Sequence, residues 1–146
     1  MDDTEFQKLR DLLMRSEEFR QRRYEEPMEN FGARLGHSYG RVNLHPRTLE
    51  QDVRRIAGQL EARWPSFTEL DLVRQRVLIH IAFDLSVAGL LMLRRLIVAV
   101  ECGFWDTAAE EMLASPWAKH DRRQAAILAE MMRVGRDLTA SHPRTA

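Results

Sequence analysis

Hydrophobic side chains recur at helical spacing from the start of the chain. Phe6, Leu9 and Leu13 follow one another at steps of three or four residues, and Glu17 extends the same stripe by one turn. Residues at this spacing share one face of an α-helix, so the pattern predicts an amphipathic helix packed on a core. A second stripe with the same spacing runs through Leu49, Val53, Ile56, Leu60 and Trp64.

Local start and stop signals divide the rest of the chain into further helices. Ser66 to Glu69 has the pattern of a capping box that opens a helix, and Val87 to Gly89 interrupts the apolar pattern. A cap is predicted at Asp106, the start of a last helix at about Asp121, and helix ends at Gly103, Ser115-Pro116 and Gly135. The expected helices therefore span residues 46–64, 70–85, 90–102, 106–113 and 121–134, and we expect them to pack as one body.

Residues 27–45 have a different character, because Gly32, Gly36 and Gly40 recur there among apolar side chains. Glycines at turns between short apolar runs predict a small β-hairpin lobe. The polar residues 138–146 are predicted to form a flexible tail. The predicted fold is mostly α-helical, with a helical lobe and a small β-hairpin lobe in one domain over residues 1–137.

Composition excludes several classes of protein. A chain of 146 residues can bury one core but has little room for a second domain. Its 22 basic and 22 acidic residues cancel, so net charge gives no general attraction to nucleic acid. Cys102 is the only cysteine, which excludes an intrachain disulfide and a metal cluster of cysteines. Without a secretory signal or a span-length apolar run, the sequence predicts a cytoplasmic protein with no membrane span.

Glu17 is the strongest candidate for a catalytic residue. A carboxylate on an apolar helix face is turned inward, and burial raises its pKa toward the range that a general acid needs. Alternatively, Glu17 pairs with an arginine of the last helix or caps a buried cluster. Glu26 follows nine positions later, and two carboxylates flanking a cleft are what glycoside hydrolysis requires. Glu18, Glu25 and Glu29 are close by, so spacing alone leaves the second partner open.

Three segments in the second half resemble the bacteriophage-type lysozyme family. They are the run from Arg76 to Leu90 (RVLIHIAFDLSVAGL), the run from Trp105 to Trp117 (WDTAAEEMLASPW) and the run from Leu128 to Gly135 (LAEMMRVG). The amino-terminal signature of that family consists of a glutamate, an aspartate, a threonine and a Gly-His pair. Its gapless match here is Glu17, Glu26, Gly32 and Gly36-His37, with Tyr24 also fitting. The resemblance covers about residues 6–136.

This resemblance implies a muramidase with a cleft between a helical lobe and a small β lobe. Such an enzyme cleaves the bond between N-acetylmuramic acid and N-acetylglucosamine in peptidoglycan. On this template Glu17 is the general acid, and Glu26 and Gly32 stand where an aspartate and a threonine hold the attacking water. Only residues 38–45 separate His37 from Pro46, so the β lobe is shortened relative to the family.

The site also departs from the family pattern. Glu26 is one methylene longer than the aspartate, and Gly32 has no hydroxyl. Gln124 occupies the position of an arginine that the family uses near the catalytic acid, although Arg122 and Arg123 are close in sequence. Because an error of ~1 Å in a reacting group can cost on the order of a hundredfold in rate, these changes predict weak or absent activity.

The sequence gives weaker support for a chemical role of candidate residues outside this motif. His80 and Asp84 lie one helical turn apart and could bind a metal or form an acid–base pair, but two ligands are incomplete without a third. A buried, satisfied polar pair is the better interpretation. Trp64 and Trp105 are predicted to lie in the core, whereas Trp117 is predicted to border the cleft. The expected substrate-binding residues are therefore Gly32, His37, Trp117 and Gln124, and no cofactor or metal is expected.

Two functions remain open at this point. The favoured one is a lysozyme-fold protein that has lost most or all catalysis and binds cell-wall glycan or a protein partner, such as a component of a phage particle. The alternative is an active muramidase. Function resides in sites rather than in folds, so three altered positions around one retained acid favour the first. Either a cytoplasmic product or a virion component fits a chain without its own export signal.

Overall fold

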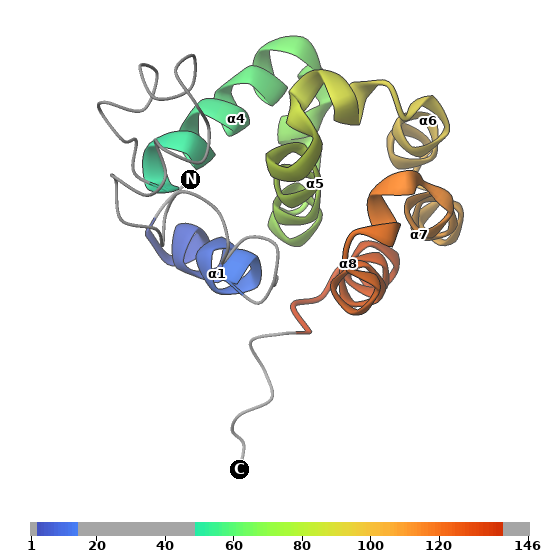
Figure 1. Cartoon of the computed structure of the whole chain (residues 1–146). Coiled ribbons are helices and arrows are strands. Elements are labelled where there is room, and N and C mark those ends of the chain that lie inside the picture. The colour runs from blue at the N-terminus through green and yellow to red at the C-terminus, as the bar shows by residue number, and fades with distance from the viewer. Residues whose placement is uncertain (1–2, 15–48, 139–146) are drawn as a thin grey trace, which may run out of the picture.

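A computed structural model describes residues 3–14 and 49–138 (Figure 1). The helices are α1 (Asp3–Met14), α4 (Leu49–Arg63), α5 (Leu72–Leu91), α6 (Arg94–Cys102), α7 (Trp105–Ala114) and α8 (Arg122–Val134). Two short 3-10 helices, η1 (Pro65–Glu69) and η2 (Pro116–Lys119), complete the set. The described part of the chain is thus mostly helical and has no strand. The predicted hairpin lobe at 27–45 and residues 139–146 of the predicted tail at 138–146 lie outside the described residues.

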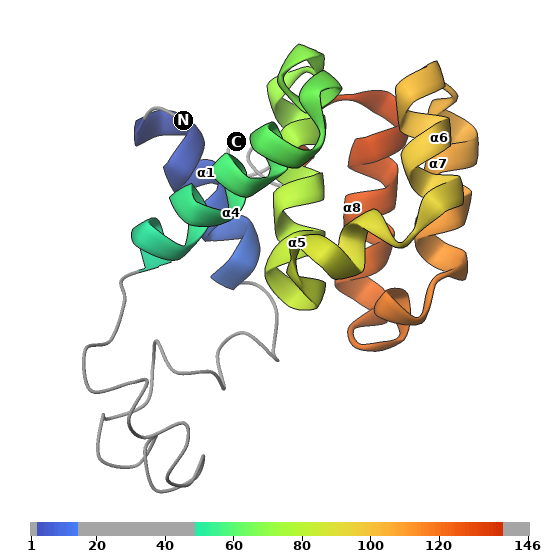
Figure 2. The same ribbon diagram turned by 90° about the horizontal axis from the view of Figure 1, so that it is seen from above.

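Helix α5 lies at the centre of the arrangement. Helices α1 and α4 pack on one side of it, and α6, α7 and α8 group on the other (Figures 1 and 2). All the described helices contribute to one hydrophobic core, whose fully buried members include Leu9, Leu13, Val53, Leu60, Leu78, Ile81, Leu96, Met112, Leu128 and Met132. The predicted stripes of the first two helices therefore face inward as expected, as shown by Leu9, Leu13, Val53 and Leu60.

The start of α5 differs from the sequence-based expectation. Pro65 begins the separate helix η1, which takes up the residues Ser66 to Glu69 that were predicted to form a capping box. Leu70 is then extended, and the side chain of Asp71 accepts a hydrogen bond of 3.0 Å from the backbone N–H of Arg74. Asp71 is thus the N-cap of α5, since its carboxylate satisfies an N–H group that has no partner within the helix.

The predicted break at Val87 to Gly89 is also displaced. The only non-helical backbone inside α5 is at Ser86, with φ 79° and ψ 161°, a conformation that residues with a side chain rarely adopt. The Ser86 hydroxyl accepts from the Gly89 N–H at 3.1 Å, so this serine caps the second half of the bent helix. A Cβ on Gly89 would lie 3.0 Å from the Leu85 Cβ. Gly89 therefore permits a close approach, and helix α5 continues to Leu91.

Three of the other predicted boundaries are confirmed. Gly103 and Gly135 end α6 and α8 in the left-handed conformation, with φ of 75° and 72°. Asp121 caps α8 through a 3.1 Å bond from the backbone N–H of Gln124. Asp106 was predicted to be a cap, but α7 begins one residue earlier, at Trp105, and places Asp106 in its first turn.

The side chain of Arg74 joins α5 to the end of α8. Its Nε donates to the Met132 carbonyl at 2.6 Å, and its Nη2 donates to the Arg133 carbonyl at 3.0 Å. The guanidinium carbon also lies 3.8 Å from the centre of the Trp105 ring, a cation–π geometry. Because these carbonyls have no partner within the helix, Arg74 acts as the C-terminal cap of α8.

Substituting Gly135 by alanine is expected to destabilise the protein. The residue has a positive φ, and a Cβ would lie 2.9 Å from the Arg74 Nη1. We expect Gly135→Ala to lower the free energy of unfolding by at least about 1 kcal/mol, because the left-handed conformation strains alanine and Arg74 must move. Gly58→Ala is the matched control, since a Cβ at this site in α4 meets nothing within 4 Å. Gly58→Ala should raise the free energy of unfolding by about 0.5–1 kcal/mol. Urea unfolding followed by circular dichroism measures both, and a Gly135→Ala variant as stable as the parent contradicts the expectation.

Arg76 forms a buried ionic cluster with the two ends of the described chain. Its side chain is only 2% exposed. The Nη1 atom donates to the Glu5 Oε1 of α1 at 2.9 Å, and the Nη2 atom donates to the Asp137 Oδ2 beyond α8 at 3.1 Å. A buried guanidinium requires such partners, since an unpaired buried charge is costly. Arg76 therefore fixes both segments against the central helix.

Candidate functional site

The predicted site residues divide into two groups. Glu17, Glu26, Gly32 and His37 lie outside the described residues. Trp117 and Gln124 are described, and both belong to the carboxyl-terminal half, on η2 and α8. The geometry of the site is therefore built from the surroundings of these two side chains.

Gln124 points into the protein and holds the end of α1. It lies in the first turn of α8, and its side chain is 4% exposed. Its Nε2 atom donates a 2.8 Å hydrogen bond to the Leu12 carbonyl. Leu12 is two residues before the end of α1 and five residues before Glu17. Gln124 thus contacts the helix end from which the chain continues toward the predicted general acid.

His80 extends this contact into α5. Its imidazole is 1% exposed, and its Nε2 atom lies 3.5 Å from the Nε2 atom of Gln124. On the other side of the ring, Nδ1 lies 3.5 Å from the Asp84 Oδ2. This distance is too long for a strong hydrogen bond, and Nδ1 makes no shorter one. His80 and Asp84 are neighbours on one helix face as expected, but the expectation of a satisfied pair is wrong, since His80 Nδ1 has no hydrogen-bond partner.

The prediction that Trp117 borders a cleft is wrong, because the residue is buried. Only 4% of its surface is exposed, and its Nε1 atom donates to the Asp84 Oδ2 at 3.0 Å. Pro116 begins η2 directly after α7, and this short turn directs the indole into the core between η2 and α5. Trp117 therefore serves as a buried hydrogen-bond donor to the carboxylate, and little of its ring is open to a ligand.

Together these residues form a polar chain through the core, with hydrogen bonds of 3.0 and 2.8 Å at its two ends and contacts of 3.5 Å on either side of His80. The polar chain runs from Trp117 through Asp84, His80 and Gln124 to the Leu12 carbonyl. It joins two predicted site residues, Trp117 and Gln124, through the His80–Asp84 pair that the sequence placed outside the site. No group of three potential ligands for a metal is found among the described His, Cys, Asp and Glu side chains. The polar chain can hold protons and orient backbone, which is a positioning role.

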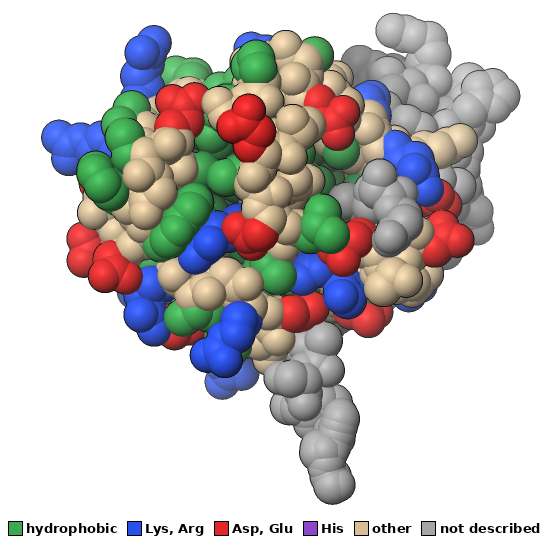
Figure 3. Space-filling model, turned by 180° about the vertical axis from the view of Figure 1, so that it is seen from behind, with side chains coloured by type: hydrophobic (Ala, Val, Ile, Leu, Met, Phe, Trp, Pro, Cys, Tyr) green, Lys and Arg blue, Asp and Glu red, His purple; other side chains and the backbone are tan. Residues whose placement is uncertain are grey.

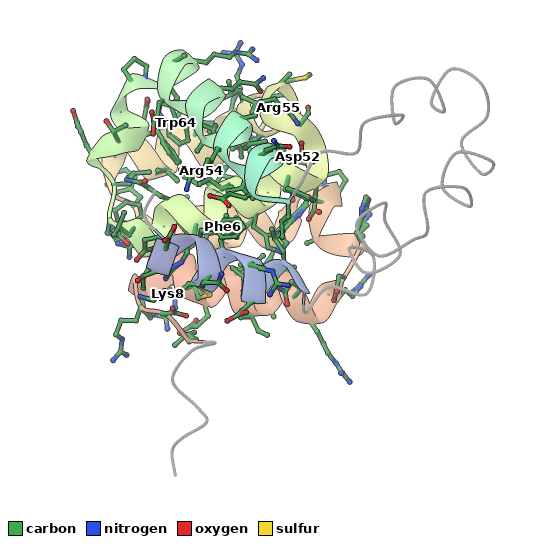
Figure 4. The ribbon with its side chains drawn as sticks, turned by 90° about the vertical axis from the view of Figure 1, so that its left-hand side faces the viewer. Phe6, Lys8, Asp52, Arg54, Arg55 and Trp64 are labelled. Carbon is green, nitrogen blue, oxygen red and sulfur yellow. The ribbon has the colours of Figure 1, made fainter. Side chains whose placement is uncertain are left out.

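A buried carboxylate on α4 is missed by sequence reasoning. Asp52 is 1% exposed, and its Oδ1 lies 3.5 Å from the Arg55 Nη2. Figure 4 shows Asp52 and Arg55 on α4, with α1 and its Phe6 side chain across from them. Asp52 lies between Leu49 and Ile56 at helical spacing. The reasoning that singled out Glu17, a carboxylate on an apolar stripe, therefore applies equally to Asp52.

The described residues on the face of the molecule shown in Figure 3 have no dominant charge. Acidic and basic side chains are interspersed over the face shown in Figure 3. The exposed Glu130 hydrogen-bonds Arg133, and this contact holds the pKa of the Glu130 carboxyl below its usual value. Across the described ranges no single helix is both long and apolar enough to cross a membrane, and α5 and α6 meet that criterion only as a pair bent by 96°.

A surface pocket lies where α7, η2 and α8 meet. It has a volume of about 340 Å³ and is lined by Leu113, Ala118, Lys119, Arg122 and Ala125. This size is at the lower end for small-ligand sites. Lys119 and Arg122 give the pocket positive charge beside apolar walls, a combination suited to an acidic group with apolar parts.

Comparison with known proteins gives no family assignment. No protein-family model matches the chain, and no curated protein or solved structure matches it. The resemblance to phage lysozymes therefore rests on the sequence motifs alone.

Proposed function

We propose that the chain is a lysozyme-fold protein related to phage muramidases, with lost or much reduced catalysis, that acts by binding cell-wall glycan or a protein partner. The observation that carries this proposal is the state of Gln124. At the position where the resemblance expects an arginine near the catalytic acid, the side chain is neutral and buried, and its amide is bonded to the Leu12 carbonyl.

Neighbouring arginines do not replace the missing charge in the interior. Arg122 and Arg123 lie next to Gln124 on α8, but both are exposed. Successive residues of a helix point in directions about 100° apart, so an inward Gln124 leaves its neighbours turned toward solvent. The interior around the end of α1 therefore contains an amide and an imidazole where the muramidase template requires a guanidinium.

The finer architecture of the proposal follows the resemblance. The resemblance implies that residues 27–45 form a shortened β-hairpin lobe facing the helical body across a cleft, with Glu17 and Glu26 flanking that cleft. An inverting glycosidase needs ~6.5–9.5 Å between its carboxyl groups to leave room for water. The longer Glu26 side chain narrows this gap, and Gly32 removes a hydroxyl that would hold the water.

An active N-acetylmuramidase is the second candidate. Its support is the retained acid: the stripe of α1 points inward at Leu9 and Leu13, and Glu17 continues this spacing. If the helical register persists, Glu17 is an inward carboxyl with a raised pKa, as a general acid requires.

Two parallel assays separate these functions. We expect the purified protein to leave the turbidity of outer-membrane-permeabilised cells unchanged, with Glu17→Gln as the blank, and to co-sediment with peptidoglycan sacculi. Arg122→Glu, which reverses a charge in the pocket, should weaken retention, whereas Arg133→Glu on the exposed side of α8 should not. Turbidity clearing well above the blank would establish the enzyme. If the protein neither lyses the cells nor is retained on the sacculi, a protein partner is the remaining binding target.

A further inference from the structure

We propose that His80 is a proton-sensitive positioning residue for the carboxyl-terminal end of α1, acting through Gln124. The neutral imidazole lets Gln124 hold the Leu12 carbonyl, and protonation of His80 releases it. This inference concerns the polar chain alone and does not depend on the proposed function.

The orientation of the Gln124 amide is fixed by its partner. A backbone carbonyl can only accept, so the atom 2.8 Å from the Leu12 oxygen must be the amide nitrogen. That nitrogen carries two hydrogens, and its second neighbour is the His80 Nε2 at 3.5 Å. For this contact to be favourable, His80 Nε2 must be the unprotonated, accepting nitrogen.

The tautomer of His80 follows from the same reasoning. With Nε2 accepting, the single proton of a neutral imidazole sits on Nδ1, which faces the Asp84 Oδ2. The carboxylate accepts the Trp117 N–H, whereas the His80 Nδ1–H faces it at 3.5 Å without a hydrogen bond. The contact with Gln124 therefore favours the neutral Nδ1–H form.

A second proton on His80 disrupts the contact between its Nε2 atom and Gln124. Protonated Nε2 is a donor and then faces the donating amide nitrogen of Gln124. If the Gln124 amide turns over, its oxygen accepts from His80 but now faces the Leu12 oxygen, and two acceptors cannot bond. The first arrangement sets two donors against each other, and turning the amide over relieves this repulsion at the cost of the bond to Leu12.

Other charged groups near His80 are already engaged. On its own helix, Arg76 pairs with the Glu5 of α1 and with Asp137. On α8, Asp121 accepts from the backbone N–H of Gln124. The helix η2 contributes Trp117 and no carboxylate, and the His120 that follows it is exposed. Asp84 is thus the charged group in ion-pair contact with His80 among the described residues.

Release would affect only one end of α1. The Glu5–Arg76 pair holds the amino-terminal part of the helix independently of His80. Loss of the Gln124 bond frees the turn around Leu12, so α1 loosens at the end that leads toward Glu17. The polar chain therefore couples proton uptake to local order in this segment.

Heteronuclear NMR of the imidazole nitrogens, combined with hydrogen exchange, tests the proposal on the unmodified protein. At about pH 8 we expect the neutral Nδ1–H tautomer of His80. On lowering the pH to about 5, the protection factors of the Leu12 and Leu13 amides should fall by about fivefold to tenfold together with proton uptake by His80, while those of α7 stay constant.

Two variants and one control complete the test. In His80→Gln the side-chain oxygen can still accept from Gln124 but cannot be protonated there, so the protection of α1 should no longer depend on pH. Gln124→Leu should leave the Leu12 turn unprotected at both pH values. His120→Gln, at an exposed histidine, should behave as the parent. An Nε2–H tautomer at high pH, a His80 that takes up no proton in this range, or an unchanged pH dependence in His80→Gln would each overturn the proposal.

Discussion

Replacing Arg76 by methionine is expected to lower the free energy of unfolding by about 3–5 kcal/mol, because it removes the buried guanidinium that pairs with the Glu5 and Asp137 carboxylates. Methionine retains much of the length of arginine but cannot donate to the Glu5 Oε1 or the Asp137 Oδ2, which now lie 2.9 and 3.1 Å from the guanidinium. Such a loss is a large share of the ~5–15 kcal/mol that stabilises a typical domain. Denaturant unfolding at neutral pH measures it.

Two further variants identify the cause of this loss. Arg133→Met removes an arginine whose partner Glu130 is exposed, so stability should change little, and the pKa of Glu130 should return toward its usual value. Adding Glu5→Gln to Arg76→Met should recover part of the lost stability, because it removes a carboxylate charge that has lost its guanidinium partner. A double variant less stable than Arg76→Met would show that packing, rather than the buried charge, dominates.

Restoring both water-holding positions is expected to produce the largest change in activity. In the proposed cleft, Glu26→Asp shortens the base by one methylene and Gly32→Thr returns the missing hydroxyl. The double variant should hydrolyse peptidoglycan on the order of a hundredfold faster than the parent, since ~1 Å in the position of a reacting group carries about this factor. Each single variant should give less than the combination, because both groups act on one water. Release of soluble fragments from sacculi measures the rates.

The parent and the blank determine how this result is interpreted. Glu17→Gln, introduced into the double variant, should abolish any activity gained, since the general acid is lost. A parent already well above the blank contradicts reduced catalysis, and a loss of rate in Glu26→Asp alone would mean that Gly32 makes room for the longer Glu26. A silent double variant would assign the defect to Gln124 or to the shortened lobe.

Local chemistry explains which helix boundaries could be predicted. Gly103, Gly135 and Asp121 act through their own backbone conformation or through a bond three residues away, so their signals are contained in the sequence. Ser66 and Gly89 carry similar signals but misled the prediction. Pro65 begins the separate helix η1, which takes up Ser66. Gly89 is needed because a side chain there would lie too close to Leu85. Deciding between these roles requires the packing of the helices.

The candidate site was predictable only in part for a related reason. Gln124 was identified by its position relative to a family motif, but its partner is a backbone carbonyl 112 positions earlier, and every residue type has such a carbonyl. Trp117 and Asp84 are 33 positions apart, and nothing in the spacing links them. His80 and Asp84 were recognised as a pair because a helix brings residues four apart together. Contacts within a helix follow from the sequence, whereas contacts between helices follow from the fold.

The cluster around Arg76 also bears on the order in which the protein folds during synthesis. Glu5 and Arg76 are 71 positions apart, and Arg76 and Asp137 are 61 apart, whereas α6, α7 and α8 are consecutive and contact one another directly. Contacts between consecutive helices form fastest, and long-range ones wait for the intervening chain. Helix α1 therefore leaves the ribosome long before its binding surface exists. Until α5 and α8 have assembled, its apolar face at Leu9, Leu12 and Leu13 has no cover, and this nascent chain is the species most exposed to aggregation and to capture by chaperones.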